Sequence, residues 1–171
     1  MSDVTIRRLG AHDLDLLMEW RERVLRSVFD LPDGKPVDAG LLDMNRAYYE
    51  KHLADGSHVA GLALLDGEAA GCGAICLYDE MPSPDNRTGC CAYLMNVFTL
   101  PAARGRGVAG TLVDWLVEQA RGAGAGKIYL ETTDMARPLY AKAGFEPMRD
   151  YMKLAGRGGR DAAAGPSSDR A

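Results

Sequence analysis

The sequence has few cysteines, and they do not have the spacing of a zinc site. Of the 4 cysteines in 171 residues, Cys90 and Cys91 are adjacent, a placement that rarely forms a disulfide or a metal site. Cys72 and Cys76 have no histidine or cysteine partner at zinc spacing. We therefore expect reduced structural thiols and no metal.

Long apolar runs and a large excess of positive charge are also missing. No run approaches the roughly 18 apolar residues of a membrane span, and the charges at Asp3, Arg7 and Arg8 are unlike a secretory leader. The formal net charge of -4 disfavours general nucleic-acid binding. We expect a cytoplasmic protein without a membrane or nucleic-acid partner, in which any basic site is local.

The composition and length fit one globular domain. The chain of 171 residues is 47% hydrophobic, which suffices for one core but not comfortably for two. From Ala155 onward, glycine, alanine, arginine, serine and aspartate dominate, and such a segment has too few apolar residues to fold alone. We predict a domain over residues 1–154 and a disordered tail over 155–171. RNA binding through the tail is a less favoured alternative.

The spacing of apolar residues predicts strands alternating with helices. Helices are expected at 13–29, 38–53 and 108–123, with a short fourth helix that contains Pro138 and ends at Gly144. The expected strands are Val4–Leu9, Val59–Leu65, Ala69–Tyr78, Cys90–Leu100, Lys127–Thr133 and a last strand or hairpin over Phe145–Leu154. This order predicts an α/β fold with a central mixed sheet flanked by about four helices.

A glycine-rich segment separates the Cys90–Leu100 strand from the helix at 108–123. It contains Arg104, Gly105, Arg106, Gly107 and Gly110. Glycines let the backbone approach a ligand closely, and the first N–H groups of a helix can face an anion. The two arginines favour a pyrophosphate. A plain turn with solvated arginines explains the loop alone equally well.

Two ordered motifs resemble the GNAT superfamily of N-acetyltransferases over about Val4–Leu154. Arg104-Gly105-Arg106-Gly107-Val108-Ala109 matches the acetyl-coenzyme A signature Arg/Gln-x-x-Gly-x-Gly/Ala. Leu139-Tyr140-Ala141-Lys142-Ala143-Gly144-Phe145 matches Leu-Tyr-x-x-x-Gly-Phe. A predicted strand separates the two motifs. Each motif alone is modest, but the ordered pair is a specific signal.

The resemblance implies the acyl-coenzyme A N-acyltransferase fold and a binding site for acetyl-coenzyme A. In such enzymes the loop amides hold the pyrophosphate, and the preceding strand offers backbone groups to the pantetheine arm and the acetyl carbonyl. Carried over by motif, the cofactor-binding residues here are Val97, Phe98, Thr99, Arg104, Gly105, Arg106, Gly107, Val108, Ala109 and Gly110.

The implied activity is direct transfer of the acetyl group from acetyl-coenzyme A to a primary amine of a small molecule or peptide. The mechanism implied is a ternary complex without a covalent acyl-enzyme. The alternative is a non-catalytic, regulatory module that binds acetyl-coenzyme A. The expected partners are the co-substrate and the amine, and assembly as a homodimer is left open.

Tyr140 matches the tyrosine that serves the leaving thiolate in the family, and a phenol is protonated at neutral pH. A purely structural role for Tyr140 is the alternative. The base that deprotonates the amine is ambiguous: Glu131 and Glu80 are the candidates, and either could be an ordinary solvated carboxylate. His58 is a weaker candidate.

One departure from the family concerns the passage from the fifth strand to the last helix. Many members carry an asparagine there in a longer loop, whereas this chain has Asp134-Met135-Ala136-Arg137-Pro138. We expect Asp134 or nearby backbone groups to make the missing coenzyme contact.

Acceptor specificity is expected in the first two helices, the loops 29–36 and 79–88 and the terminal hairpin, which flank the sheet. These loops carry several carboxylates, which would suit a cationic amine. The same aspartates are also ordinary turn residues. The carboxylates concerned are Asp30, Asp33, Asp79, Glu80 and Asp85.

Overall fold

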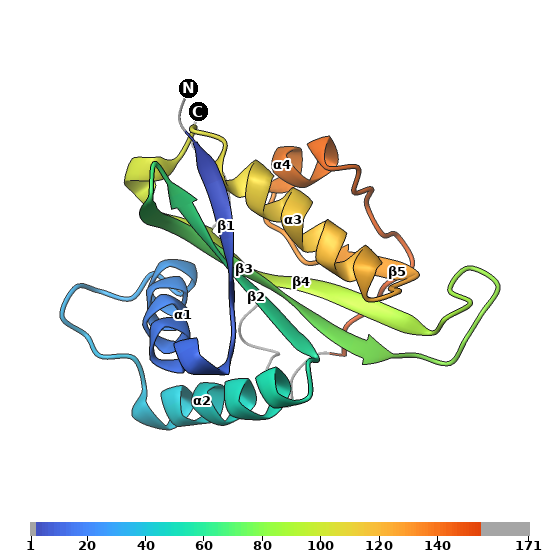
Figure 1. Cartoon of the computed structure of the whole chain (residues 1–171), viewed down its shortest axis with the longest axis horizontal. Coiled ribbons are helices and arrows are strands. Elements are labelled where there is room, and N and C mark those ends of the chain that lie inside the picture. Colours follow the sequence, from blue (N-terminus) through green and yellow to red (C-terminus); the bar gives the residue numbers. More distant parts are fainter. Residues whose placement is uncertain (1–2, 155–171) are drawn as a thin grey trace, which may run out of the picture.

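Five strands form one mixed sheet with helices on both faces (Figure 1). The structure is a computed structural model, which describes residues 3–154. The strands are β1 (Val4–Leu9), β2 (His58–Leu65), β3 (Glu68–Asp79), β4 (Cys90–Thr99) and β5 (Lys127–Leu130). The helices are α1 (Leu14–Val28), α2 (Ala39–Ala54), α3 (Val108–Gly122) and α4 (Arg137–Lys142), with short 3-10 turns at Ala11–Asp13 and Pro101–Ala103.

The strands lie in the sheet in the order in which they occur in the chain. The pairs β1–β2, β2–β3 and β3–β4 are antiparallel, whereas β5 runs parallel to β4 after the crossover through α3. The Asp66–Gly67 turn between β2 and β3 has φ of 52° and 88° at its two residues, as a two-residue hairpin turn of type I′ requires. The α/β class, the mixed sheet and the four helices are as the sequence predicts.

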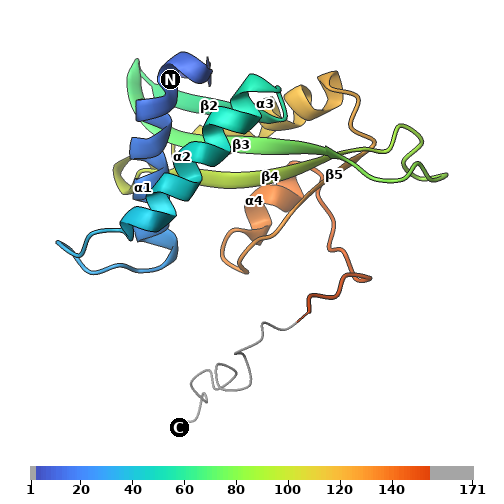
Figure 2. The same ribbon diagram turned by 90° about the horizontal axis from the view of Figure 1, so that it is seen from below.

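Each face of the sheet is covered by its own pair of helices (Figures 1 and 2). α1 and α2 cover one face, where Trp20 and Tyr49 are buried. α3 covers the other with the fully buried Leu112 and Leu116, and α4 adds partly buried side chains there. Gly73 of β3 lies under α3, and a Cβ there would be 3.0 Å from both leucines. A larger residue at this position would push the ends of these two leucines aside, so glycine favours the close packing of α3 on the sheet.

Two of the expected strands differ from the structure. β5 ends at Leu130 rather than at Thr133. The strand or hairpin expected over Phe145–Leu154 is wrong, because no helix or strand is assigned to these residues. Pro147 has no N–H for a sheet ladder, and the apolar side chains of the segment, such as Met152, are largely exposed. The predicted tail at 155–171 lies outside the described residues, and within 3–154 no helix is long and apolar enough to cross a bilayer.

Candidate active site

A β-bulge interrupts β4 on the strand that carries the predicted coenzyme contacts. Ala74 of β3 pairs with Met95 and Cys72 pairs with Phe98, so three steps along β4 face two along β3. Asn96, inside the bulge, has a φ of 60°. As a result the consecutive side chains of Met95 and Asn96 both line the cavity under α1 and α2. Val97 returns to the opposite face and packs with the α3 cluster.

Beyond the bulge, β4 has an edge that β5 does not cover. The β4–β5 pairing ends at Leu94 and Leu130, whereas β4 continues to Thr99. The Leu100 N–H donates to the Ala70 carbonyl at 2.9 Å, on the β3 side. Because backbone groups alternate in direction along a strand, those of Val97 and Thr99 point to the uncovered side. An extended ligand could therefore hydrogen-bond along this edge.

Thr99 adds a side-chain group at the end of the same edge. Its Oγ1 is buried and has no hydrogen-bond partner among the described residues. A buried hydroxyl without a partner costs free energy unless a ligand or water satisfies it. The hydroxyl thus supports a polar ligand at this point of β4.

The glycine loop joins the end of β4 to α3. Gly105 and Gly107 have φ of 74° and 85°, and a Cβ at either residue would meet nothing within 4 Å. α3 begins at Val108 with Gly107 as N-cap, and no side chain caps the first turn. The first N–H groups of α3 therefore have no side-chain acceptor and can bind an anion. Arg106 is ion-paired with Asp66 at 2.9 Å.

Tyr93 lies near both Tyr140 and Glu131, where β4 and β5 separate. Burial raises the pKa of Tyr140, and the Tyr93 phenol nearby raises it further. Burial also raises the pKa of Tyr93, with a smaller contribution in the same direction from the Glu131 carboxylate. Tyr140 packs on Phe145 with ring centroids 6.0 Å apart. The Tyr140 phenol is thus held protonated at neutral pH and can donate a proton.

A cavity of about 350 Å³ lies between α1, α2 and the sheet, beside the bulge. Its lining residues are Arg21, Asn45, Tyr48, Tyr49, His58, Tyr93, Met95 and Asn96. The guanidinium of Arg21 crosses it and donates from Nε to Asn45 Oδ1 and from Nη1 to Asn96 Oδ1, each at 2.8 Å. The bulge therefore lies between this cavity and the uncovered edge of β4.

His58 lies at the inner end of this cavity in a neutral state. It is 5% exposed, and its Nδ1 is 3.1 Å from the Tyr48 hydroxyl. Burial lowers its pKa to about 4, with smaller contributions from the positive charges of His52 and Arg21. Its Nε2 is buried and has no partner among the described residues. One ring nitrogen is therefore available to a ligand.

The low pKa of His58 predicts a loss of stability in acid. Between pH 6.5 and pH 4 the unfolded chain binds a proton at His58 that the folded chain does not bind. The free energy of unfolding therefore falls as the pH falls through this window, by about 3 kcal/mol from this residue. In His58→Gln, urea unfolding at a series of pH values should show a shallower dependence. An unchanged dependence would contradict the buried, neutral state, and His12→Gln, an exposed histidine, serves as the control.

Comparison of the sequence and the fold with known proteins identifies the family of this chain. The model of the acetyltransferase (GNAT) family matches residues 17–145, which is most of the chain. The chain belongs to the GNAT family. This confirms the family, the fold and the enzyme class that the two motifs predict, an acetyl-coenzyme A-dependent N-acetyltransferase.

Individual relatives agree with the assignment to the GNAT family. Glucosamine 6-phosphate N-acetyltransferase 1 of Oryza sativa subsp. japonica is 34% identical over 112 residues, which cover 64% of this chain and 66% of that one. The uncharacterized N-acetyltransferase YjgM of Escherichia coli is 32% identical over 75% of each chain. A predicted acetyltransferase of Clostridium acetobutylicum, solved with acetyl-CoA, superposes with a TM-score of 0.76 at 27% identity, over 90% of this chain and 96% of that one.

Not all of the predicted site residues of this GNAT enzyme lie together. Val97, Thr99 and the glycine loop lie along one edge, and Tyr140 and Glu131 lie beside its inner end. Glu80 lies instead by Cys90, at the start of β4, nine strand steps or roughly 30 Å from Thr99. Its carboxylate accepts from Lys127 Nζ at 2.9 Å, and this contact lowers the pKa of Glu80. Glu80 therefore lies far from Thr99 and the glycine loop, although the Tyr78 hydroxyl, which is 3.2 Å from its carboxylate, connects it to Tyr129.

The surroundings of two other predicted coenzyme contacts, Asp134 and Phe98, do not point directly to such a role. Asp134 follows β5 in a turn, its side chain 98% exposed and 3.1 Å from Arg137. The Phe98 side chain packs on Trp20 under α1, with ring centroids 6.4 Å apart, and its backbone points to β3 by the alternation of the strand. This ring contact holds β4 against α1.

The sequence patterns missed the residues that line the cavity. Arg21 and Asn45 lie on different helices, and only the tertiary packing places them beside Asn96. His58 was the weakest candidate for a base, and the structure shows it buried in this cavity. The one signal in the sequence was a polar residue, Arg21, on the otherwise apolar face of α1. The carboxylates expected on the acceptor side do not line this cavity.

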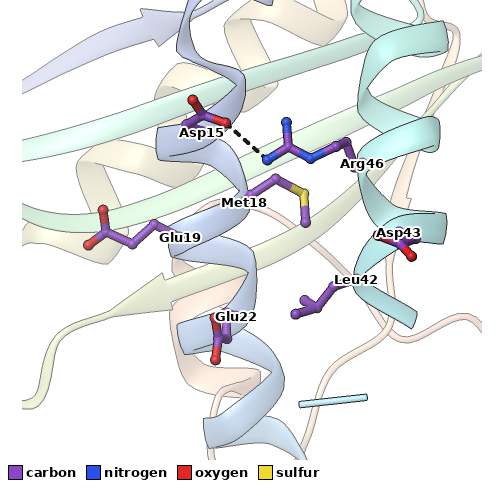
Figure 3. A pocket seen from close by; sticks show the side chains of 7 residues that line it. All are labelled: Asp15, Met18, Glu19, Glu22, Leu42, Asp43 and Arg46. Carbon is purple, nitrogen blue, oxygen red and sulfur yellow. Dashed lines mark hydrogen bonds and ion pairs between the residues drawn. The ribbon is translucent and has the colours of Figure 1, made fainter. Parts of the chain in front are cut away.

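An acidic hollow lies on the outer side of the same two helices (Figure 3). It has a volume of about 410 Å³, and its lining includes Glu19 and Glu22 of α1 and Leu42 and Asp43 of α2. Arg46 crosses the hollow and binds Asp15 at 2.9 Å. The hollow is open to solvent, and none of its lining residues belongs to β4 or the glycine loop.

Proposed function

We propose that this GNAT enzyme transfers the acetyl group of acetyl-coenzyme A directly to a primary amine bound in the cavity under α1 and α2. The observation that carries the proposal is the bulge at Asn96, which lines the cavity and directly precedes the uncovered edge of β4. With the coenzyme along that edge and the amine in the cavity, the two substrates meet without a covalent acyl-enzyme. The catalytic domain is proposed to span residues 1–154.

The coenzyme is proposed to extend along β4 into the glycine loop. Val97 and Thr99 would bind its pantetheine arm and acetyl carbonyl through backbone groups, and the α3 N-terminus would bind its pyrophosphate. Arg104 is exposed beside this loop and would add positive charge, whereas Arg106 is already paired with Asp66. Asp134, which is exposed and paired with Arg137, is assigned no more than a contact at the rim.

Tyr140 is proposed to donate a proton to the departing thiolate. Its raised pKa keeps the proton on the phenol until the C–S bond breaks. The amine attacks the carbonyl carbon, the C–N bond forms, and the acetyl group leaves the sulfur. The amine must lose a proton in the same sequence, and Glu131 is proposed to take it, directly or through water, because it lies by Tyr93, which in turn lies near Tyr140.

Substituting Glu131 by glutamine tests the assignment of the base. The rate at neutral pH should fall by about 10- to 100-fold, because general-base assistance is lost, and the loss should shrink at higher pH, where the amine is already neutral. Initial rates of thiol release over pH 6.5–9.5 measure this. Glu80→Gln is the matched control and should leave the rate unchanged. A rate loss in Glu80→Gln with none in Glu131→Gln would reverse the assignment.

Thiol release from acetyl-coenzyme A in the presence of an amine panel tests the activity as a whole. The panel should contain amino acids, amino sugars, polyamines, aminoglycosides and peptides, because the rice relative is named for glucosamine 6-phosphate. Intersecting double-reciprocal plots would support the ternary complex, and parallel plots would indicate an acyl-enzyme. Light scattering in the same buffer would decide between a monomer and the homodimer.

A further inference from the structure

Arg21 differs from the other arginines of α1 in having no carboxylate partner among the described residues. Arg23 binds Glu19 at 2.7 Å and Arg26 binds Glu22 at 3.1 Å, each one turn away on the same helix. The partners of Arg21 are two side-chain amides, which carry no negative charge. The positive charge of Arg21 is therefore not neutralised inside the cavity.

The guanidinium also keeps hydrogen-bonding capacity for a ligand. A guanidinium has five N–H donors in a fixed plane. The two amides use one donor on Nε and one on Nη1, and Nη2 has no partner among residues 3–154. The two amides also fix the plane of the group, because they hold it from α2 and from β4. The remaining donors suit two oxygens of one anionic group.

The other groups around Arg21 favour an anion as well. The lining residues include no aspartate or glutamate. His58 is neutral, and burial raises the pKa of Tyr49 to about 12, so that neither supplies a negative charge at neutral pH. The buried Nε2 of His58 has no partner, which is an independent sign that a polar ligand group belongs here.

The position of Arg21 connects this anion site to the reaction. Arg21 binds Asn96, the bulge residue next to Val97, so that an anion on Arg21 lies beside the end of the coenzyme edge. A positive charge near the acceptor also disfavours the ammonium form of the amine and favours the neutral form that attacks. The same residue can thus hold the acceptor and aid its deprotonation.

We propose that Arg21 binds an anionic group of the acceptor, so that the substrates are primary amines that also carry a carboxylate or a phosphate. This inference rests on the proposed function. It replaces the expectation of a cationic amine held by acidic loops. Arg21 acts here as a specificity-determining residue, and His58 offers a hydrogen bond to the same molecule.

The test compares matched pairs of amines with the wild-type chain. Amino acids are paired with their amides, and glucosamine 6-phosphate with glucosamine, in the thiol-release assay. The anionic member of at least one pair should have a kcat/KM at least about 10-fold higher, as for a charge-assisted bidentate contact. A gain in the first pair identifies a carboxylate and a gain in the second a phosphate. Equal rates within both pairs would overturn the inference.

The variant Arg21→Met should raise the KM for the anionic acceptor by about 10- to 100-fold. The loss of kcat/KM should be at least about 10-fold larger for the anionic acceptor than for its neutral partner. The Kd of acetyl-coenzyme A should stay within about 3-fold, and Arg21→Lys should keep part of the preference. Arg23→Met removes the same charge from the same helix and should change neither value. Equal losses with both members of a pair would show a purely structural role and overturn the inference.

The outcomes separate this inference from the proposed function. Release of thiol with neutral amines alone would keep the acetyltransferase activity and reject the anionic acceptor. No release with any amine would reject the proposed function, and the inference with it. Thermal unfolding of each variant checks that it folds, and the wild-type pairs decide the question even if Arg21→Met does not fold.

Discussion

Replacing Gly107 by glutamate is expected to abolish measurable binding of acetyl-coenzyme A. Gly107 is the N-cap of α3 with a φ of 85°, and a Cβ there would point into open space. In the proposed complex that space holds the pyrophosphate, so the new side chain would meet it with both bulk and negative charge. The Kd should rise at least about 100-fold, measured by calorimetry.

The strain of a side chain at positive φ must be separated from the effect on the ligand. Gly124 is the matched control, because its φ of 82° is nearly the same and it also has open space around it, at the other end of α3. Gly124→Glu should bind the coenzyme normally. Gly107→Gln, which has the same bulk without the charge, should fall between the two. Normal binding by Gly107→Glu would show that the loop is not the pyrophosphate site.

Removing the hydroxyl of Tyr140 should have the largest effect on turnover. Tyr140→Phe keeps the ring packed against Phe145 but has no proton to donate. We expect kcat to fall by about 100-fold or more, with the Kd of acetyl-coenzyme A unchanged, because the lost interaction forms only as the thiolate leaves. The rate of thiol release gives kcat, and calorimetry gives the Kd of acetyl-coenzyme A.

The control for this substitution is Tyr151→Phe, an exposed tyrosine that lies beside Lys127. It should leave kcat unchanged. The pH dependence of the wild-type rate gives a second test. Because burial raises the pKa of Tyr140, the phenol should keep its proton up to at least about pH 10, and the rate should not fall for this reason at lower pH. Full activity of Tyr140→Phe would remove this residue from the mechanism and leave it a packing role.

Local signals were sufficient for most of the fold. Asp66-Gly67 predicts the β2–β3 hairpin because few residues accept two positive φ values in succession, and the change from strand to helix spacing after Gly107 predicts the β4–α3–β5 unit. The prediction of a strand or hairpin over Phe145–Leu154 was wrong because it relied on the apolar residues of this segment, such as Met148 and Tyr151. The described structure provides no packed face for them, and Pro147 interrupts a ladder.

The two halves of the candidate site differ in whether local sequence or long-range packing specifies them. The sequence by itself determined the proposed coenzyme side, since the glycine loop and the Leu139-to-Phe145 motif are each contiguous in the chain and each needs its residue types for local backbone or chemical reasons. Only the tertiary structure decided the acceptor side. Arg21, Asn45, His58 and Asn96 come from four elements, and their contacts depend on how α1 and α2 pack on a bulged strand. Long-range packing leaves no fixed spacing in a sequence, so the positive charge at the cavity could not be predicted from the chain alone.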